Sequence, residues 1–383
     1  MAKDTSRKSK ENLAAGDTSA ATLRQPVELR YADELKRLAA ADADPKPPGW
    51  KLSAKAVRRF IIGDETLCVT RKFYGDDALV ERAIVTVISA QGLMLVGEPG
   101  TAKSMLSELL AAAVSGTSDL VVQGSAGTTE DHVRYSWNYA LLLAQGPSEA
   151  ALVPSPVLSA MRHGRIVRVE ELTRCPPEIQ DTMISILSEK TISIPELGDD
   201  TPGSVVRARP GFNVIGTANL RDRGVHEMSS ALKRRFNFET VHPLSDPILE
   251  RELIMLQLKE RVPEETSRAA LPGNVLDLIV ATFQELRTGR SRDGIQVARP
   301  EAVMSTAEAV NVAHASLLEA TYLGPSKVTG QHVANQLHGV VLKDNVEDGK
   351  KFRAYMEHIA KPRAEADPEW RAFYEAVRKQ RFG

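Results

Sequence analysis

The sequence predicts an α/β domain with a mainly parallel sheet, followed by an all-α domain. Up to His242, short apolar runs alternate with segments of helical periodicity, which is typical of parallel strands joined by crossover helices. Beyond His242 the apolar runs fade, and the helical spacing of apolar residues continues. The chain of 383 residues has room for two or three domains, because a domain averages about 150 residues.

The composition excludes several classes of protein. With 49 Lys and Arg against 50 Asp and Glu, the formal net charge is −1, which argues against a protein that coats nucleic acid or an anionic membrane. Two distant cysteines, Cys68 and Cys175, exclude a disulfide framework and a thiolate zinc site. The longest near-apolar stretch, residues 83–97, is shorter than the roughly 20 residues of a membrane-spanning helix. The charged amino terminus lacks the apolar segment of a secretory signal, so a cytoplasmic protein is expected.

Residues 1–50 are expected to form a flexible tail and a linker. Up to Gln25 the chain is rich in Lys, Ser, Thr and Ala without apolar periodicity, a composition typical of disordered segments. Residues 26–41 have the apolar spacing of a short amphipathic helix. The prolines that follow disfavour helix and predict a linker: Pro45, Pro47 and Pro48.

Residues 51–242 are expected to hold the α/β core. Short apolar runs with the length of central strands, covered on both faces, are predicted over 93–96, 120–122, 166–169 and 212–217. Helices are expected over 102–114, after the first strand, and over 177–188, where prolines suit a helix start.

Residues 243–345 are expected to form a helical lid domain, and residues 346–383 a helical extension. Apolar residues at helical spacing predict lid helices over 247–261, 275–286, 300–318 and 330–342. Aromatic residues at roughly helical spacing predict that the extension forms one or two terminal helices: Phe352, Tyr355, Trp370, Phe373 and Tyr374.

A phosphate-binding loop is the sharpest motif of the chain. The segment GLMLVGEPGTAKS, residues 92–104, consists of an apolar strand, a glycine-rich turn and a Lys-Ser pair that begins a helix. Backbone N–H groups of such a turn surround an anion, the helix amino terminus adds partial positive charge, and Lys103 reaches the terminal phosphates. The hydroxyl of Ser104 would bind Mg²⁺. The candidate nucleotide-binding residues are Gly97, Glu98, Pro99, Gly100, Thr101, Ala102, Lys103 and Ser104.

The loop departs at one position from the strict pattern G-x-x-x-x-G-K-[ST]. Ala102 stands where the second glycine belongs, and alanine suits that position only with a negative φ. Because this residue falls at the first helical turn, a right-handed conformation is expected. The alternative for the segment is a strand, turn and helix with a surface lysine, which the agreement of all four features disfavours.

Two adjacent carboxylates end the strand in GRIVRVEEL, residues 164–172. In a nucleotide hydrolase the first, Glu170, would belong to the Mg²⁺ shell, and the second, Glu171, would polarise the attacking water as general base. The first residue of such a pair is usually Asp, so the longer Glu170 changes the metal geometry. The alternative is that the pair only caps the next helix.

An amide and three arginines complete the candidate site. Asn219 follows the strand of FNVIGTANLRD, at the sheet edge where ligands of open α/β sheets bind, and would orient the water; the alternative is a turn residue. Arg234 and Arg235 in SSALKRRFNF would face the γ-phosphate of a neighbouring subunit; the alternative is a favourable interaction with the helix dipole. Arg299, just before Pro300 at the expected start of a lid helix, would reach the nucleotide from the other side.

In this order the motifs resemble those of the AAA+ ATPases, which are P-loop NTPases, and within them the MoxR branch. Residues 97–104 have the G-x-P-G-x-A-K-S form of the MoxR loop, which accounts for the alanine. The stretch 171–195 resembles the family segment that forms a helix and then a β-hairpin before the Asn strand. The resemblance covers about residues 74–342 and implies a P-loop AAA+ core with a helical lid.

The resemblance also implies roles for individual residues. Glu171 would be the catalytic base, Asn219 sensor 1 and Arg299 sensor 2, while Arg235 with Arg234 would be the finger that acts in trans. Glu170 departs from the Asp of the family pattern. Tyr74 and Gly75 fall where the adenine pocket of the family lies.

Taken as a whole, the resemblance implies an ATPase that uses ATP and Mg²⁺ in a homo-oligomeric ring, usually a hexamer. Such rings act like chaperones on a client protein, often one with a von Willebrand factor A domain. The longer Glu170 leaves open a second function, a nucleotide-binding scaffold or switch with slow or no hydrolysis. A nucleic-acid motor is disfavoured, because the sequence has no zinc module and no aromatic-basic stacking stretch.

Overall fold

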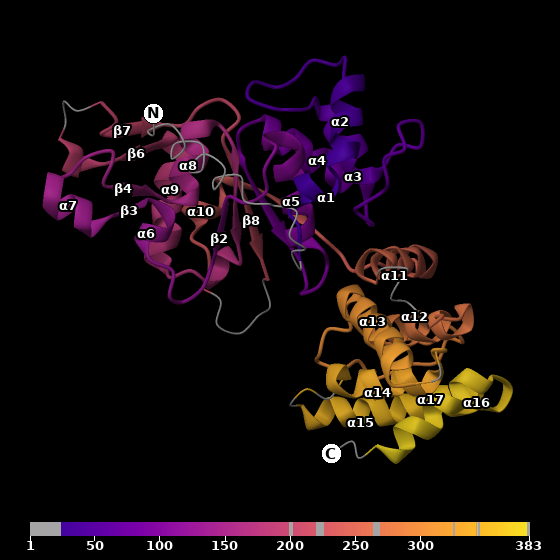
Figure 1. Ribbon diagram of the computed structural model, residues 1–383. Coiled ribbons are helices and arrows are strands. Elements are labelled where there is room, and N and C mark those ends of the chain that lie inside the picture. Colours follow the sequence, from indigo (N-terminus) through magenta and orange to yellow (C-terminus); the bar gives the residue numbers. More distant parts are fainter. Residues whose placement is uncertain are drawn as a thin grey trace, which may run out of the picture.

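The computed structural model describes residues 24–198, 202–219, 226–262, 269–324, 326–341, 343 and 345–380. These residues form an α/β domain and a helical domain, which are joined by the chain that leaves the sheet for helix α11 (Figure 1). The predicted fold class is therefore confirmed. The tail up to residue 23 lies outside the described residues.

The amino-terminal segment is folded against the α/β domain. The helix predicted over 26–41 forms as α1 (Val27–Arg30) and α2 (Ala32–Ala41), which are separated at Tyr31. Leu38 and Trp50 are only 1% and 8% exposed, so residues 27–50 do not form the flexible linker that we expected. Their apolar side chains join the core beneath α3 (Ala54–Ile62) and α4 (Asp77–Ile88), which offsets the entropy of ordering the segment.

A five-stranded parallel sheet forms the centre of the α/β domain. Its order is β2-β5-β8-β1-β9, with β1 (Gly92–Val96), β2 (Val121–Gln123), β5 (Ile166–Glu170), β8 (Asn213–Ala218) and β9 (Phe236–Thr240). The four predicted strands are confirmed. The fifth, β9, completes the edge beside β1.

Helices cover both faces of this sheet, because alternate strand residues point to opposite sides. Leu93 and Leu95 pack with α3, α4 and α5 (Lys103–Ser115). Met94 and Val96 pack with α8 (Pro156–His163) and α9 (Pro177–Glu189). The central strands β1, β5 and β8 are buried along their whole length, as expected for strands that helices cover on both faces.

Two small hairpins and short helices project from this body (Figure 1). The hairpin of β6 (Thr191–Ser193) and β7 (Val205–Arg207) follows α9, as the resemblance implies. A second hairpin, β3 (Tyr135–Trp137) with β4 (Leu152–Pro154), was not predicted. The remaining elements are α6 (Glu130–Val133), α7 (Tyr139–Gln145), α10 (Ser230–Lys233) and the 3₁₀ turns Leu172–Arg174 and Pro195–Leu197.

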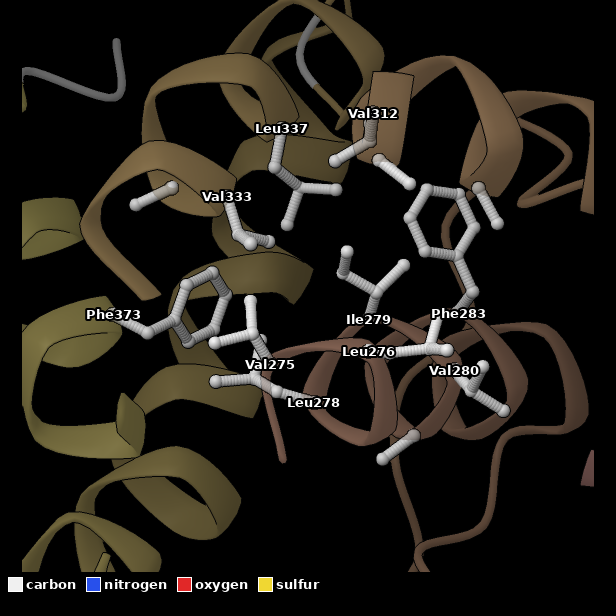
Figure 2. Close-up of a cluster of buried hydrophobic side chains, with 14 of the residues drawn as sticks. Val275, Leu276, Leu278, Ile279, Val280, Phe283, Val312, Val333, Leu337 and Phe373 are labelled. Atoms are coloured by element: carbon white, nitrogen blue, oxygen red, sulfur yellow. The ribbon is translucent and has the colours of Figure 1, made fainter. Parts of the chain in front are cut away.

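The helical domain has one hydrophobic core. Its helices are α11 (Pro247–Arg261), α12 (Gly273–Thr288), α13 (Thr306–Tyr322), α14 (Gly330–Val341), α15 (Val346–Tyr355), a π-helical turn (Met356–Ala360), α16 (Lys361–Ala366) and α17 (Pro368–Lys379). Figure 2 shows Phe373 of the carboxyl-terminal segment beside Val275 of α12 and Val333 of α14. The predicted lid and extension therefore share this core.

One lid helix begins later than predicted. We expected a helix from Pro300, but α13 begins at Thr306. Ser305 and Glu308 form a capping box there: the Ser305 hydroxyl accepts from the Glu308 N–H, and the Glu308 carboxylate accepts from the Ser305 N–H. This cap satisfies the first backbone donors and defines the start.

None of the described helices is long and apolar enough to cross a membrane.

A buried ion pair fixes the helical domain to the linking chain. The carboxylate of Glu250 on α11 is fully buried and accepts from Arg287 Nη2 on α12 at 2.7 Å and from Thr306 Oγ1 at 2.8 Å. Arg287 Nη1 also donates to the carbonyl oxygen of Leu244, in the linking chain, at 2.7 Å. The orientation of α11 is therefore tied to the chain that leaves the sheet.

Candidate active site

The glycine-rich loop lies between β1 and α5 and borders a cleft between the two domains. This cleft has a volume of about 380 Å³ and is lined by the loop, by Glu171 and Asn219, and by residues of α11 and α13. Lys103 is buried, and its Nζ donates to the carbonyl oxygens of Gly97 at 3.1 Å and Glu98 at 2.7 Å. The lysine is thus folded under the loop, at the amino terminus of α5, where anions are favoured.

Ala102 is left-handed, contrary to our expectation of a right-handed residue. Its φ is +68° and its ψ is +22°, and it directly precedes the first residue of α5. The chain needs this conformation to pass from the loop into the helix, and it costs an alanine about 1–2 kcal/mol. Strain of this kind persists where surrounding structure imposes it, as at functional loops.

At Gly100, both the backbone conformation and the close approach of Ser305 favour glycine. Its φ is +75°, and a Cβ atom built there would lie 2.4 Å from the hydroxyl oxygen of Ser305. Ser305 caps α13, so the loop and the helical domain touch at this residue. A larger side chain would force the loop or the cap of α13 to shift.

Glu170 and Ser104, the predicted Mg²⁺ ligands, lie side by side. Ser104 Oγ donates to Glu170 Oε2 at 2.6 Å, and Thr217 Oγ1 donates to the same oxygen at 2.7 Å. Ser107 Oγ donates to Oε1 at 2.8 Å. Hard oxygen donors in this arrangement suit Mg²⁺, which takes few protein ligands and completes its shell with phosphate and water. No cluster of three or more His, Cys, Asp or Glu that could hold a metal occurs among the described residues.

Glu171 and Asn219 meet at the carboxyl edge of the sheet. They follow the neighbouring strands β5 and β8, and Asn219 Nδ2 donates to Glu171 Oε1 at 2.7 Å. Glu171 is left-handed, with φ +55°, and its N–H donates to Thr217 Oγ1 at 3.0 Å. The turn after β5 therefore aims the carboxylate at Asn219 and the cleft that holds the loop.

Arg234 and Arg235 lie at the opposite edge of the sheet. They directly precede β9, and because all five strands are parallel, this is the edge at which the strands begin. Arg235 donates from Nε to Ser188 Oγ at 2.8 Å and from Nη1 to the Ala231 carbonyl at 2.7 Å, while Arg234 is exposed. Neither is among the described residues that line the cleft.

Arg299 lies in the loop before α13 and not at a helix start. Its Nε and Nη2 donate to the carbonyl oxygen of Thr288 at 2.9 and 2.5 Å, so the guanidinium caps the end of α12. The residue lines a second hollow, of about 540 Å³, together with Glu98 and Asn219. It is therefore near the loop but held by its own domain.

Sequence reasoning missed part of the cleft. Gln257 and Arg261, one turn apart on α11, line it together with Met105 and Tyr74. No motif marks them, because their place depends on how the helical domain docks. Of the two residues that the resemblance assigns to the adenine pocket, Tyr74 lines this cleft, whereas Gly75 lines a different hollow.

Two family profiles match the chain, one in each domain. Residues 92–236 match an AAA domain of the dynein-related subfamily. Residues 249–380 match the YehL-like AAA+ ATPase C-terminal domain. The protein YehL of Escherichia coli (strain K12) is 47% identical over 354 residues, which cover 92% of this chain and 96% of YehL. The chain belongs to the YehL-like AAA+ ATPases.

Other proteins are similar to this YehL-like ATPase over part of the chain only, or over most of it at low sequence identity and with a TM-score below 0.5. Protein SH1500 of Staphylococcus haemolyticus (strain JCSC1435) is 31% identical over 146 residues, 38% of this chain and 53% of SH1500. The structure of NtrX from Brucella abortus in complex with ATP covers 81% of this chain and 69% of that one, with a TM-score of 0.45 and 14% identity. The Thermotoga maritima RuvB Holliday junction branch migration motor covers 76% of this chain and 78% of that one, with a TM-score of 0.44 and 13% identity.

The two family profiles and the similarity to YehL confirm the resemblance to the AAA+ ATPases. Neither profile names the MoxR branch. The YehL-like profile spans both the predicted lid and the extension, in agreement with the shared core of α11–α17.

Proposed function

We propose that this protein binds ATP with Mg²⁺, hydrolyses it in an oligomeric ring, and uses the energy to remodel a partner protein, as MoxR proteins do. The observation that carries the proposal is the contact of Asn219 with Glu171, at 2.7 Å, in the same cleft as Lys103. A carboxylate, an amide that orients it and a lysine under a phosphate loop are the groups needed to attack a γ-phosphate with water.

Each of these groups has a distinct part in the proposed reaction. The ammonium of Lys103 and the N–H groups of the loop bind the phosphates and stabilise the charge that develops on them. Glu171 accepts the proton of the attacking water, and Asn219 holds its carboxylate in place. Mg²⁺, when bound with the nucleotide, neutralises phosphate charge, and Ser104 with Glu170 would hold it.

A ring assembly is part of the proposal. Arg234 and Arg235 lie at the edge of the sheet opposite the cleft, so they do not act on the nucleotide of their own subunit. In a ring, that edge would face the cleft of a neighbour, and an arginine supplied in trans raises hydrolysis by about 10³–10⁵. We propose a hexamer as the form of assembly. As the partner, we propose a client protein with a von Willebrand factor A domain.

A second candidate function is a nucleotide switch with slow hydrolysis. It is favoured by the three hydroxyls that already bind the Glu170 carboxylate, because these contacts would compete with the binding of Mg²⁺ by the same oxygens. Glu170→Asp, which shortens the side chain and loosens these contacts, separates the two functions. A several-fold rise in turnover would support the switch, and a fall would support a hydrolase adapted to glutamate.

Site variants test the proposed hydrolysis. We expect Lys103→Ala to lose nucleotide binding, and Glu171→Gln to bind ATP but turn over about 10²–10⁴ times more slowly, the usual contribution of a general base. Glu178→Gln, an exposed carboxylate on α9, is the matched control and should leave turnover unchanged. Turnover per subunit should rise with protein concentration as rings assemble. Equal turnover in the Glu171 and Glu178 variants would remove Glu171 as the base.

A further inference from the structure

A buried arginine lies beneath the phosphate loop. Arg168 stands in the middle of β5, two residues before Glu170, so both side chains leave the same face of the strand. It is only 9% exposed, and its neighbours in the strand, Val167 and Val169, belong to the apolar core. A charge in such a strand is costly unless other groups compensate it.

The guanidinium of Arg168 is only partly compensated. Its Nη1 lies 3.6 Å from Glu170 Oε1 and 3.5 Å from the carbonyl oxygen of Ser104. Its Nε is buried and has no hydrogen-bond partner in the part of the chain that the structure describes. The Ser104 carbonyl belongs to the first turn of α5, so the cation also sits at the positive end of that helix. Arg168 does not line the cleft, so its charge acts on the nucleotide site through the carboxylate of Glu170.

We infer that Arg168 is a resident countercharge of the nucleotide site, which lets the loop hold a nucleoside triphosphate with little dependence on Mg²⁺. The ion pair with Arg168 offsets the charge of Glu170, which would otherwise repel the phosphates when no metal is bound. The same positive charge opposes the entry of a divalent cation beside Glu170. This inference rests on the nucleotide binding proposed above, and it makes Arg168 a positioning residue that acts through Glu170.

The length of Glu170 belongs to the same arrangement. Its two oxygens reach three hydroxyls, on α5 and β8, while Oε1 still faces Arg168. The carboxylate is therefore held in place by hydroxyl groups of two elements. The two unusual residues of the strand, Arg168 and Glu170, are explained by one function.

The test compares nucleotide affinity with and without Mg²⁺. The probe is ATP with a methylanthraniloyl group on the ribose, and its Kd is measured by fluorescence in excess Mg²⁺ and in excess EDTA. For the natural protein we expect EDTA to raise Kd by less than about tenfold, since a nearby buried cation already compensates the carboxylate. For Arg168→Met, which keeps an unbranched apolar stem and loses the charge, we expect the ratio of Kd in EDTA to Kd in Mg²⁺ to grow by about tenfold or more.

Arg168→Lys is the matched control, because it keeps the positive charge, and its ratio should stay near that of the natural protein. A structural role alone would change the affinity of Arg168→Met equally in Mg²⁺ and in EDTA, and that result would overturn the inference. If Arg168→Met does not fold, the natural protein still tests the inference. A loss of ATP affinity of more than about a hundredfold in EDTA, relative to Mg²⁺, contradicts a resident countercharge. Absence of binding in both conditions would instead contradict the proposed function, and the inference with it.

Discussion

The buried pair of Arg287 and Glu250 gives a sharp test of how the helical domain is held. Arg287 makes three hydrogen bonds at 2.7 Å, to Glu250 Oε1 and to the carbonyl oxygens of Leu244 and Met304. We expect Arg287→Met to lower the free energy of unfolding of this domain by about 3–5 kcal/mol, because it leaves the fully buried carboxylate of Glu250 without its counterion.

The double variant Arg287→Met with Glu250→Gln should recover much of this loss. In the natural protein Thr306 Oγ1 and Gln284 Nε2 donate to separate oxygens of Glu250, at 2.8 and 2.9 Å. The amide introduced by Glu250→Gln is neutral, and its oxygen can accept from Gln284 Nε2 while its NH₂ group donates to the Thr306 hydroxyl. Two carbonyl oxygens then remain without Arg287, at about 1 kcal/mol each. The double variant should therefore lose about 2 kcal/mol, which is about 1–3 kcal/mol less than Arg287→Met alone. The coupling energy should equal this difference plus the loss measured for Glu250→Gln alone.

The assay is urea unfolding followed by tryptophan fluorescence. The chain has three tryptophans, and only Trp370 belongs to the helical domain, where it packs edge-on against Phe373. In a background with Trp50→Phe and Trp137→Phe, the emission therefore reports that domain. A loss below about 1 kcal/mol for Arg287→Met, or a double variant as unstable as the sum of the single ones, would refute the reasoning.

Two further predictions concern the loop and the thiols. Gly100→Ala and Gly116→Ala place alanine at nearly the same φ, +75° and +73°, but the new Cβ lies 2.4 Å from Ser305 Oγ at Gly100 and no closer than 3.5 Å, to Lys51 Cγ, at Gly116. Gly100→Ala should therefore lose about 1–3 kcal/mol more than Gly116→Ala in urea unfolding, and equal losses would remove the proposed contact of loop and lid. Burial raises the pKa of the Cys175 thiol, so at pH 8 this thiol stays protonated. Cys175 should therefore react with a thiol reagent only after unfolding, whereas the exposed Cys68 should react in the native protein. Rapid labelling of both cysteines would contradict the burial of Cys175.

The sheet could be predicted from the sequence because its strands are marked locally. Four apolar runs of the right length gave four strands, and the glycine-rich turn between the first of them and a helix gave the loop. The start of α13 could not be predicted in the same way, since proline at position 300 and the cap at Ser305 both suit a helix start. The docked segment 27–50 was missed because its burial depends on a surface supplied by α3 to α5.

The candidate site was predictable where it follows from topology. The carboxyl ends of neighbouring parallel strands meet, and this brought Glu171 to Asn219 and Glu170 to the loop. The conformation of Ala102 and the binding of Arg299 to the end of α12 depend on tertiary contacts, which local patterns do not contain. Arg168 had a visible signal, a charge inside an apolar strand, although its partners could only be found in the structure.

A single-turnover experiment with Glu171→Gln tests the central claim most directly. The variant and the natural protein, each at a concentration in excess of the nucleotide, are loaded with radiolabelled ATP and Mg²⁺. The bound nucleotide is then identified over time. The account predicts that the natural protein converts bound ATP to ADP, while Glu171→Gln retains intact ATP about 10²–10⁴ times longer. Conversion to ADP by Glu171→Gln at the rate of the natural protein would contradict it.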